Sequence, residues 1–133
     1  MKRSTRLGLV TVIGLSAAVA GAATLPRALS PAAGGLWELS TRADGHGATR
    51  MCVRSPELLA QYEHRQRRCE RTVVSDRGAE AIISYTCAEG GFGRSQVTLL
   101  TPRTLRIDTQ GISNNLPFHY QLHARRIGDC RAR

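Results

Sequence analysis

From residue 36 onward, apolar and polar side chains alternate with a period of two over seven short stretches. This period places successive side chains on opposite faces of a strand and is typical of half-buried β-sheets. Turn sequences rich in glycine, asparagine and aspartate separate the stretches. The pattern therefore predicts strands at residues 36–41, 48–53, 69–75, 79–87, 94–100, 104–109 and 117–126.

One stretch, from Ser55 to about His64, breaks this alternation. Ser55 suits a helix N-cap, Pro56 suits the first helical position, and Glu57 is favourable near the positive end of a helix. We therefore predict a mostly β fold with one short helix near residues 55–64. Because the connections are short and closure removes exposed edges, the strands should form an antiparallel meander, as a small curved sheet or a partly closed barrel.

The first 22 residues have the composition of a secretory signal peptide. Three basic residues precede an apolar run from Leu7 to Ala20, and Ala20-Gly21-Ala22 fits a small-residue cleavage site. The run has about 14 residues, fewer than the roughly 20 that span a membrane. We expect cleavage near Ala22, a periplasmic location and no transmembrane segment in the mature protein. A leader that stayed uncleaved would instead anchor the chain.

The composition of the chain changes between the leader and the first predicted strand. Residues 23–35 are rich in alanine, proline, glycine and serine, which is typical of a flexible tether. The remainder is long enough for one domain. The expected organisation is a signal peptide at 1–22, a tether at 23–35 and a single β domain at 36–133.

Four cysteines, Cys52, Cys69, Cys87 and Cys130, would oxidise in an exported protein. None of their spacings matches a zinc site or a Cys-x-x-Cys redox motif, so we predict disulfides, no metal and no cofactor. Three connectivities are open. We favour Cys52–Cys69, which would fasten the helix to the sheet, together with Cys87–Cys130, which would hold the C-terminal tail.

Positive charge is the next feature of the chain. The leader contains three of the 19 basic residues and none of the ten acidic ones, so the other 16, all arginine, leave a net charge of +6. Arginine forks bind phosphate and carboxylate groups, and two clusters could meet an anionic envelope component: Arg65, Arg67, Arg68 and Arg71, and then Arg125 and Arg126. The other interpretation is that a GC-rich genome encodes arginine in place of lysine and that the clusters are solvated surface. Nucleic acid is disfavoured by export and by the lack of interleaved aromatic residues.

The sequence contains no recognisable catalytic set, and we predict that the protein is not an enzyme. There is no Gly-x-Ser-x-Gly elbow and no evident pair of acids. His119 and His123 share one face of the last predicted strand, but roughly 13 Å separates them, which is too far for one metal ion. The glycines of Gly90-Gly91-Phe92-Gly93 lack the lysine and helix of a phosphate loop and indicate a hairpin connection.

Several segments together resemble a family of small exported bacterial proteins, domain-of-unknown-function family 3617. They are Gly35-Leu36-Trp37-Glu38, Cys52 followed by Ser55-Pro56-Glu57-Leu58, a lone Cys69, Cys87 followed by glycines, and Arg125-Arg126-Ile127-Gly128-Asp129-Cys130. The resemblance implies an exported β domain with paired cysteines and no established activity. Gly35-Leu36-Trp37 also resembles the start of lipocalin-type barrels, in which an arginine of the last strand packs on the tryptophan; here that would be Arg125 or Arg126.

These observations favour a non-enzymatic module that binds a lipid or another small apolar or amphipathic ligand in a concave sheet. The expected contacts are the apolar positions of the predicted inner face, which would serve equally as ordinary core: Trp37, Leu39, Val97, Leu99, Leu105 and Ile107. The alternative is an interaction protein that uses the arginine clusters on an anionic envelope component or a partner protein.

Overall fold

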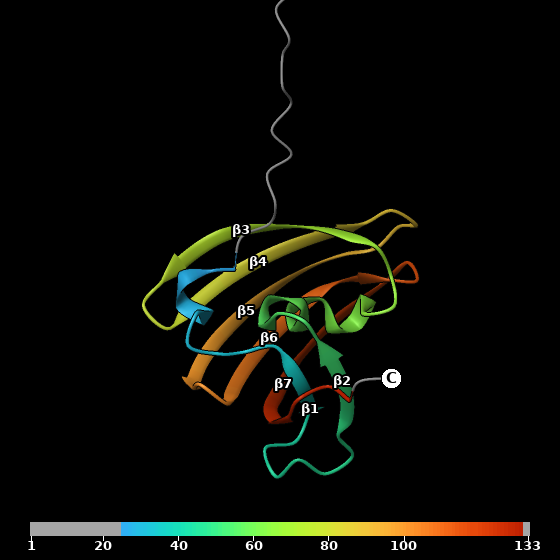
Figure 1. Cartoon of the computed structure of the whole chain (residues 1–133). Helices are drawn as coiled ribbons and strands as arrows, with labels where there is room; N and C mark the ends of the chain where they lie inside the picture. The colour runs from blue at the N-terminus through green and yellow to red at the C-terminus, as the bar shows by residue number, and fades with distance from the viewer. Residues whose placement is uncertain (1–24, 132–133) are drawn as a thin grey trace, which may run out of the picture.

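Seven strands form one antiparallel sheet in the computed structural model, which describes residues 25–131 (Figure 1). The strands are β1 (Gly35–Ser40), β2 (Thr49–Val53), β3 (Cys69–Arg77), β4 (Glu80–Cys87), β5 (Phe92–Thr101), β6 (Thr104–Ser113) and β7 (Leu116–Gly128). All seven coincide with predicted strands, and the mostly β fold class is confirmed. The predicted signal peptide lies outside the described residues.

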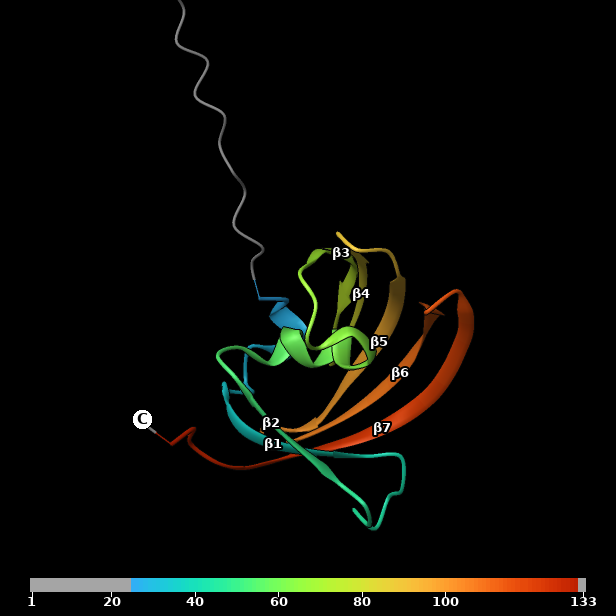
Figure 2. The ribbon, with the colours of Figure 1, turned by 90° about the vertical axis from the view of Figure 1, so that its right-hand side faces the viewer.

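The order of strands across the sheet is β2-β1-β7-β6-β5-β4-β3. Strands β3 to β7 form the predicted meander, and β1 returns to pair with β7, so that β2 and β3 become the two edges. The sheet bends strongly without closing (Figure 2). Of the two alternatives for the sheet, the open curved form is therefore the one observed.

The predicted helix is present as η2 (Pro56–His64), a 3-10 helix with a non-helical residue at Gln61. Pro56 occupies its first turn as expected. Ser55 has the extended backbone of an N-cap, but its side chain caps no backbone N–H and instead donates to the Glu57 carboxylate. Ser55 is therefore the N-cap residue as predicted, but its side chain does not stabilise the helix start by capping an N–H.

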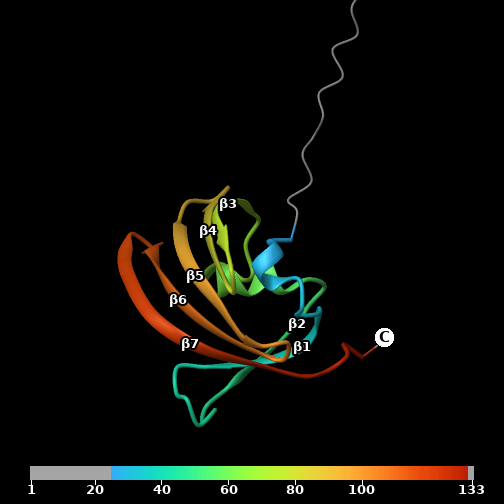
Figure 3. The same cartoon turned by 90° about the vertical axis from the view of Figure 1, so that its left-hand side faces the viewer.

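The core lies between the concave face of the sheet and the two helices, η2 and η1 (Arg27–Leu29) (Figures 2 and 3). Alternate residues of each strand point into it, as a period of two requires. Each large apolar side chain that is removed from water there contributes about 1.5–3 kcal/mol to folding. The largest of these buried side chains are Trp37, Leu29, Leu39, Leu59, Ile83, Leu105, Ile107 and Leu122.

The segment that precedes β1 belongs to this core, which corrects the prediction of a flexible tether at 23–35 for its described part. Leu29 is completely buried, and Ala28 and Ala32 are nearly so. The carboxylate of Asp76 accepts the backbone N–H groups of Arg27 and Ala28, each at 2.8 Å, and these bonds lower the pKa of Asp76. The ordered domain therefore begins about ten residues earlier than composition suggested.

The disulfides are Cys52–Cys130 and Cys69–Cys87, so the predicted pairing is wrong. Cys69 and Cys87 are directly opposite one another in the β3–β4 ladder. Leu36 of β1 pairs with Cys52 on one side and with Gly128 on the other, which brings the chain end to the β2 edge. The prediction failed because it joined neighbours along the sequence, whereas β1 brings distant segments together.

Candidate functional site

The six apolar positions predicted to contact a ligand form closed core. Trp37, Leu39, Val97, Leu105 and Ile107 are each at most 1% exposed, and Leu99 packs against them. Helices η1 and η2 contact the strands that carry most of these side chains. A ligand in the concave face would have to displace both helices, so these positions are corrected to structural residues.

The predicted anion-binding arginines lie in two separate regions, and five of the six contact other parts of the chain. Arg65 stacks on the Tyr62 ring at 4.4 Å, Arg67 donates to Gly90 and Asn114, and Arg71 donates to Gln61. These contacts are intramolecular. They fasten the end of η2 and the loops beside it to the sheet, which leaves these guanidinium groups less available to a partner.

The arginines of β7 have similar structural roles. Arg125 forms an ion pair with Glu38 at 3.1 Å. Arg126 is the cross-strand partner of Trp37 and donates to the Gly34 carbonyl at 2.9 Å and to Asp129 at 2.6 Å. Of the two arginines considered for the lipocalin-like position, Arg126 is thus the one paired with the tryptophan.

A buried polar cluster lies where η2 meets the sheet. Nδ1 of His64 is 3.0 Å from the hydroxyl of Tyr85. The hydroxyl of Ser95 donates to the Ala60 carbonyl and lies 2.8 Å from the hydroxyl of Thr109. Burial raises the pKa of Tyr85 to about 12, so its phenol is neutral. Tyr85 packs directly over Gly93, where any side chain would collide with its ring. His64 is 3% exposed, so the cluster joins η2 to the sheet and has little access to solvent.

The pH dependence of stability provides a test of this cluster. Burial lowers the pKa of His64, an effect that Glu63 only partly offsets. The unfolded chain then binds more protons below about pH 6.5, so stability should be full above that pH and should fall as the pH drops toward the lowered pKa. We expect His64→Asn to remove this decline in urea unfolding measured between about pH 7 and pH 5. The exposed His46→Asn should keep it, and an unchanged slope in His64→Asn would contradict a buried neutral imidazole.

Neither helix of residues 25–131 covers the convex face of the sheet, and its outward side chains form rows across β4, β5, β6 and β7. In two neighbouring rows the polar groups satisfy one another. Gln96 donates to Glu80 at 2.7 Å, and Gln121 donates to Asp108 at 2.8 Å. Such cross-strand pairs are the usual way in which a polar sheet face is stabilised.

A third row differs from these two. It consists of Ser84, Arg94, Gln110 and His119, which are consecutive partners in the ladders of β4 to β7. Within residues 25–131, none of these four side chains has a hydrogen bond or an ion pair with another group. The row thus places a cation, an amide, a hydroxyl and an imidazole side by side. None of them is hydrogen-bonded or ion-paired to another group of the described chain.

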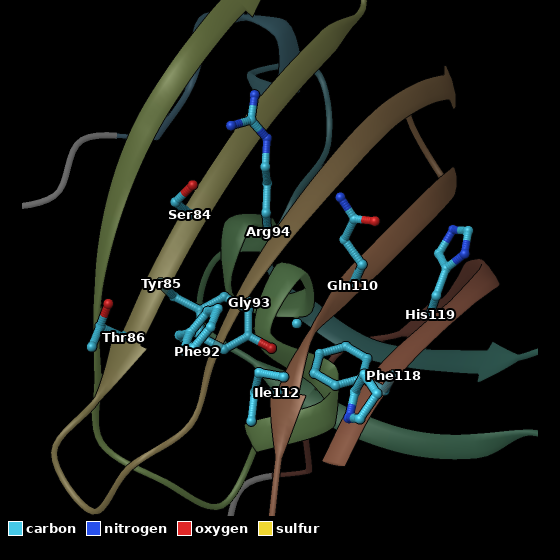
Figure 4. Close-up of a pocket in the computed structure, with 12 residues that line it drawn as sticks. Ser84, Tyr85, Thr86, Phe92, Gly93, Arg94, Gln110, Ile112, Phe118 and His119 are labelled. Atoms are coloured by element: carbon cyan, nitrogen blue, oxygen red, sulfur yellow. The ribbon is translucent and has the colours of Figure 1, made fainter. Parts of the chain in front are cut away.

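The next row toward the β6–β7 turn is largely apolar and contains Phe92, Ile112 and Pro117. Both rows line one open cavity of about 680 Å³, with the backbones of Gly93 and Gly111 in its floor. Figure 4 shows Arg94, Gln110 and His119 projecting from adjacent strands above the ring of Phe92 and the side chain of Ile112. Phe92 is 52% exposed, which is unusual for a phenylalanine in a small domain. The cavity thus combines an apolar wall with unpaired polar groups, as small-molecule sites do.

This site was not predicted from the sequence. His119 was placed on one face of the last predicted strand, which is confirmed, but that face was given no function. Two signals were present: a phenylalanine between glycines at 91–93, and an outward Ile112 in a strand whose other outward residues are polar. Neither signal is informative until the strand register places the two side chains next to each other.

Comparison with known proteins adds one finding. The model of a family described as "Protein of unknown function (DUF3617)" matches residues 30–130, which covers the whole sheet and both disulfides. No curated protein and no solved structure matches the chain significantly. The described part of the chain, residues 25–131, also has no helix that is both long and apolar enough to cross a membrane.

Proposed function

The chain belongs to this family of proteins of unknown function, and we propose that it is an exported, non-enzymatic module that binds a small amphipathic molecule on the convex face of its sheet. The observation that supports this proposal is the cavity of about 680 Å³, in which exposed apolar side chains meet a row of unpaired polar groups. Its volume is in the usual range of small-molecule sites.

A periplasmic location is part of the proposal. The predicted leader at residues 1–22 supports export, and two disulfides with no free cysteine among residues 25–131 support an oxidising compartment. The only buried histidine of the described chain bonds to a tyrosine beneath η2 and is itself 3% exposed. A binding role without catalysis therefore accounts for the arrangement of the polar side chains.

Replacement of Phe92 by serine tests the cavity. The side chain is half exposed, so the variant should fold, but it should lose a large part of the apolar wall. We expect binding of 1-decanol, an uncharged amphiphile, to weaken about tenfold, because contact with a phenyl ring contributes on the order of 1–2 kcal/mol. Isothermal titration of the full chain, kept below the solubility limit of the alcohol, measures this change.

The matched control is Val74→Ser. Val74 is 50% exposed and lies on the edge strand β3, which contributes no residue to the cavity. This variant should bind 1-decanol as the wild type does. Absence of 1-decanol binding to the wild type, or an equal loss in both variants, would contradict the proposed site.

A further inference from the structure

We propose that this cavity selects amphiphiles that carry an oxyanion head group, a carboxylate or a phosphate, and that the guanidinium of Arg94 binds this head group. The inference rests on the proposed function and extends it by naming the class of ligand. In the bound state the apolar part of the molecule lies along Phe92 and Ile112.

Arg94 has no acid to pair with, unlike three other arginines of the convex face. Arg125 and Arg50 share Glu38, and Arg106 lies 3.9 Å from Asp108. Arg94 has no ion pair in the described part of the chain. An unpaired guanidinium beside an apolar wall is complementary to an anion that has an apolar substituent.

The acids on β4 and β6, the two strands that flank β5, are already engaged. Asp108, one row away on β6, accepts from Gln121 and faces Arg106. Glu80, on β4, accepts from Gln96. Because these carboxylates have their own partners, the positive charge of Arg94 is not neutralised from within the sheet and is available to an external anion.

The two neighbours of Arg94 in its row complete a receptor for an oxyanion. Ser84 on β4 and Gln110 on β6 flank it, each one strand away, or about 4.8 Å. A hydroxyl and an amide N–H on either side of a guanidinium can donate to the same two or three oxygen atoms. Figure 4 shows Arg94 and Gln110 extending from the sheet in similar directions.

His119 lies two strands from Arg94, roughly 10 Å across the sheet, and is too far to share a small head group with it. It flanks Gln110 and marks the far side of the row. The apolar row begins two residues along each strand from the polar row, about 7 Å away. A head group at Arg94 thus places the first few carbons of an attached chain against Phe92 and Ile112.

Polarity and charge disfavour two other classes of ligand at this site. A fully apolar molecule would leave Arg94 and Gln110 facing its surface without partners, which costs free energy when they lose water. An amphiphile with a cationic head would oppose Arg94 directly. An anionic head group accepts hydrogen bonds from Arg94 and Gln110, and its tail then lies on the apolar wall.

Isothermal titration of the full chain with three ligands of one chain length tests the inference: decanoate, decyl phosphate and 1-decanol, each below its micellar concentration. We expect Arg94→Gln to bind decanoate and decyl phosphate at least about tenfold more weakly than the wild type, because a charge-assisted bidentate contact is lost. Binding of 1-decanol should not change. The control is Arg77→Gln, which removes the same charge from an exposed position at the opposite end of the β3–β4 hairpin.

The outcomes separate this inference from the proposed function. If 1-decanol binds through Phe92 but Arg94→Gln binds the acids as the wild type does, the cavity stands and the head-group selection is overturned. If none of the three ligands binds, both are overturned. Arg94-dependent binding of both acids supports the inference, and the tighter of the two shows whether the site prefers a carboxylate or a phosphate.

Discussion

Replacement of both Cys52 and Cys130 by alanine is expected to lower the free energy of unfolding by roughly 4–5 kcal/mol, because this disulfide closes a long loop. The two residues are 78 positions apart, so their link restricts most of the unfolded chain. The other disulfide, Cys69–Cys87, spans 18 positions, and its double-alanine variant should lose only about 3 kcal/mol. Urea unfolding of the oxidised full-length variants measures both changes.

The difference between the two variants is the informative result. Cys69–Cys87 joins β3 to β4, and Cys52–Cys130 joins β2 to the segment that follows β7. Loop length is the main factor that separates their effects in the unfolded chain. Peptide mapping without reduction should recover Cys52 linked to Cys130. Recovery of Cys52 linked to Cys69, or a greater loss from the short loop than from the long one, would contradict the arrangement of β1 between β2 and β7.

Replacement of Leu29 by alanine should lower the free energy of unfolding by about 3 kcal/mol, which is the usual cost of removing a fully buried leucine side chain. Leu29 is 0% exposed and belongs to the short helix η1 that precedes the sheet. The size of the effect separates two descriptions of the segment before β1. A loosely attached tether would tolerate the change, whereas a part of the core would not.

Leu100→Ala is the control for this experiment. Leu100 is 53% exposed at the end of β5, and its truncation should change stability by less than about 0.5 kcal/mol. Thermal or urea unfolding compares the two variants directly. Similar small effects at both positions would mean that η1 does not contribute to the core.

The pattern of apolar and polar residues was sufficient to predict the strands because most of them have one face in the core and one in water. Burial of Ala81, Ile83 and Tyr85 between more exposed neighbours in β4 is an example. The N-terminal segment was missed because its apolar residues do not alternate. Leu25, Ala28, Leu29 and Ala32 instead follow a helical spacing, which their proline- and glycine-rich surroundings concealed.

The disulfides and the candidate site could not be predicted, because both depend on strand order. Nothing in the local sequence indicates that β1 lies between β2 and β7, and that order is what brings Cys52 to Cys130. In the same way, Ser84, Arg94, Gln110 and His119 are unremarkable outward residues of four strands until the register aligns them. The predicted ligand positions were the right inner face, but the two helices fill it.

The same physical account explains why a ligand would bind outside the curved sheet. The concave face has to provide the core of a small domain, and η1 and η2 complete it. The convex face is left to solvent, so most of its rows are polar and paired with one another. An apolar row next to an unpaired arginine departs from this pattern, and we assign the binding site to that departure.

The most direct test of the central claim is an amide ¹H–¹⁵N NMR titration of the full chain with decanoate. The account predicts saturable shifts confined to residues 84–86, 92–94, 110–112, 118 and 119, where β4, β5, β6 and β7 line the cavity. Shifts centred on Trp37, Leu105 and Ile107 would place the ligand in the concave core instead. That result, or the absence of any saturable shift, would contradict a binding site on the convex face.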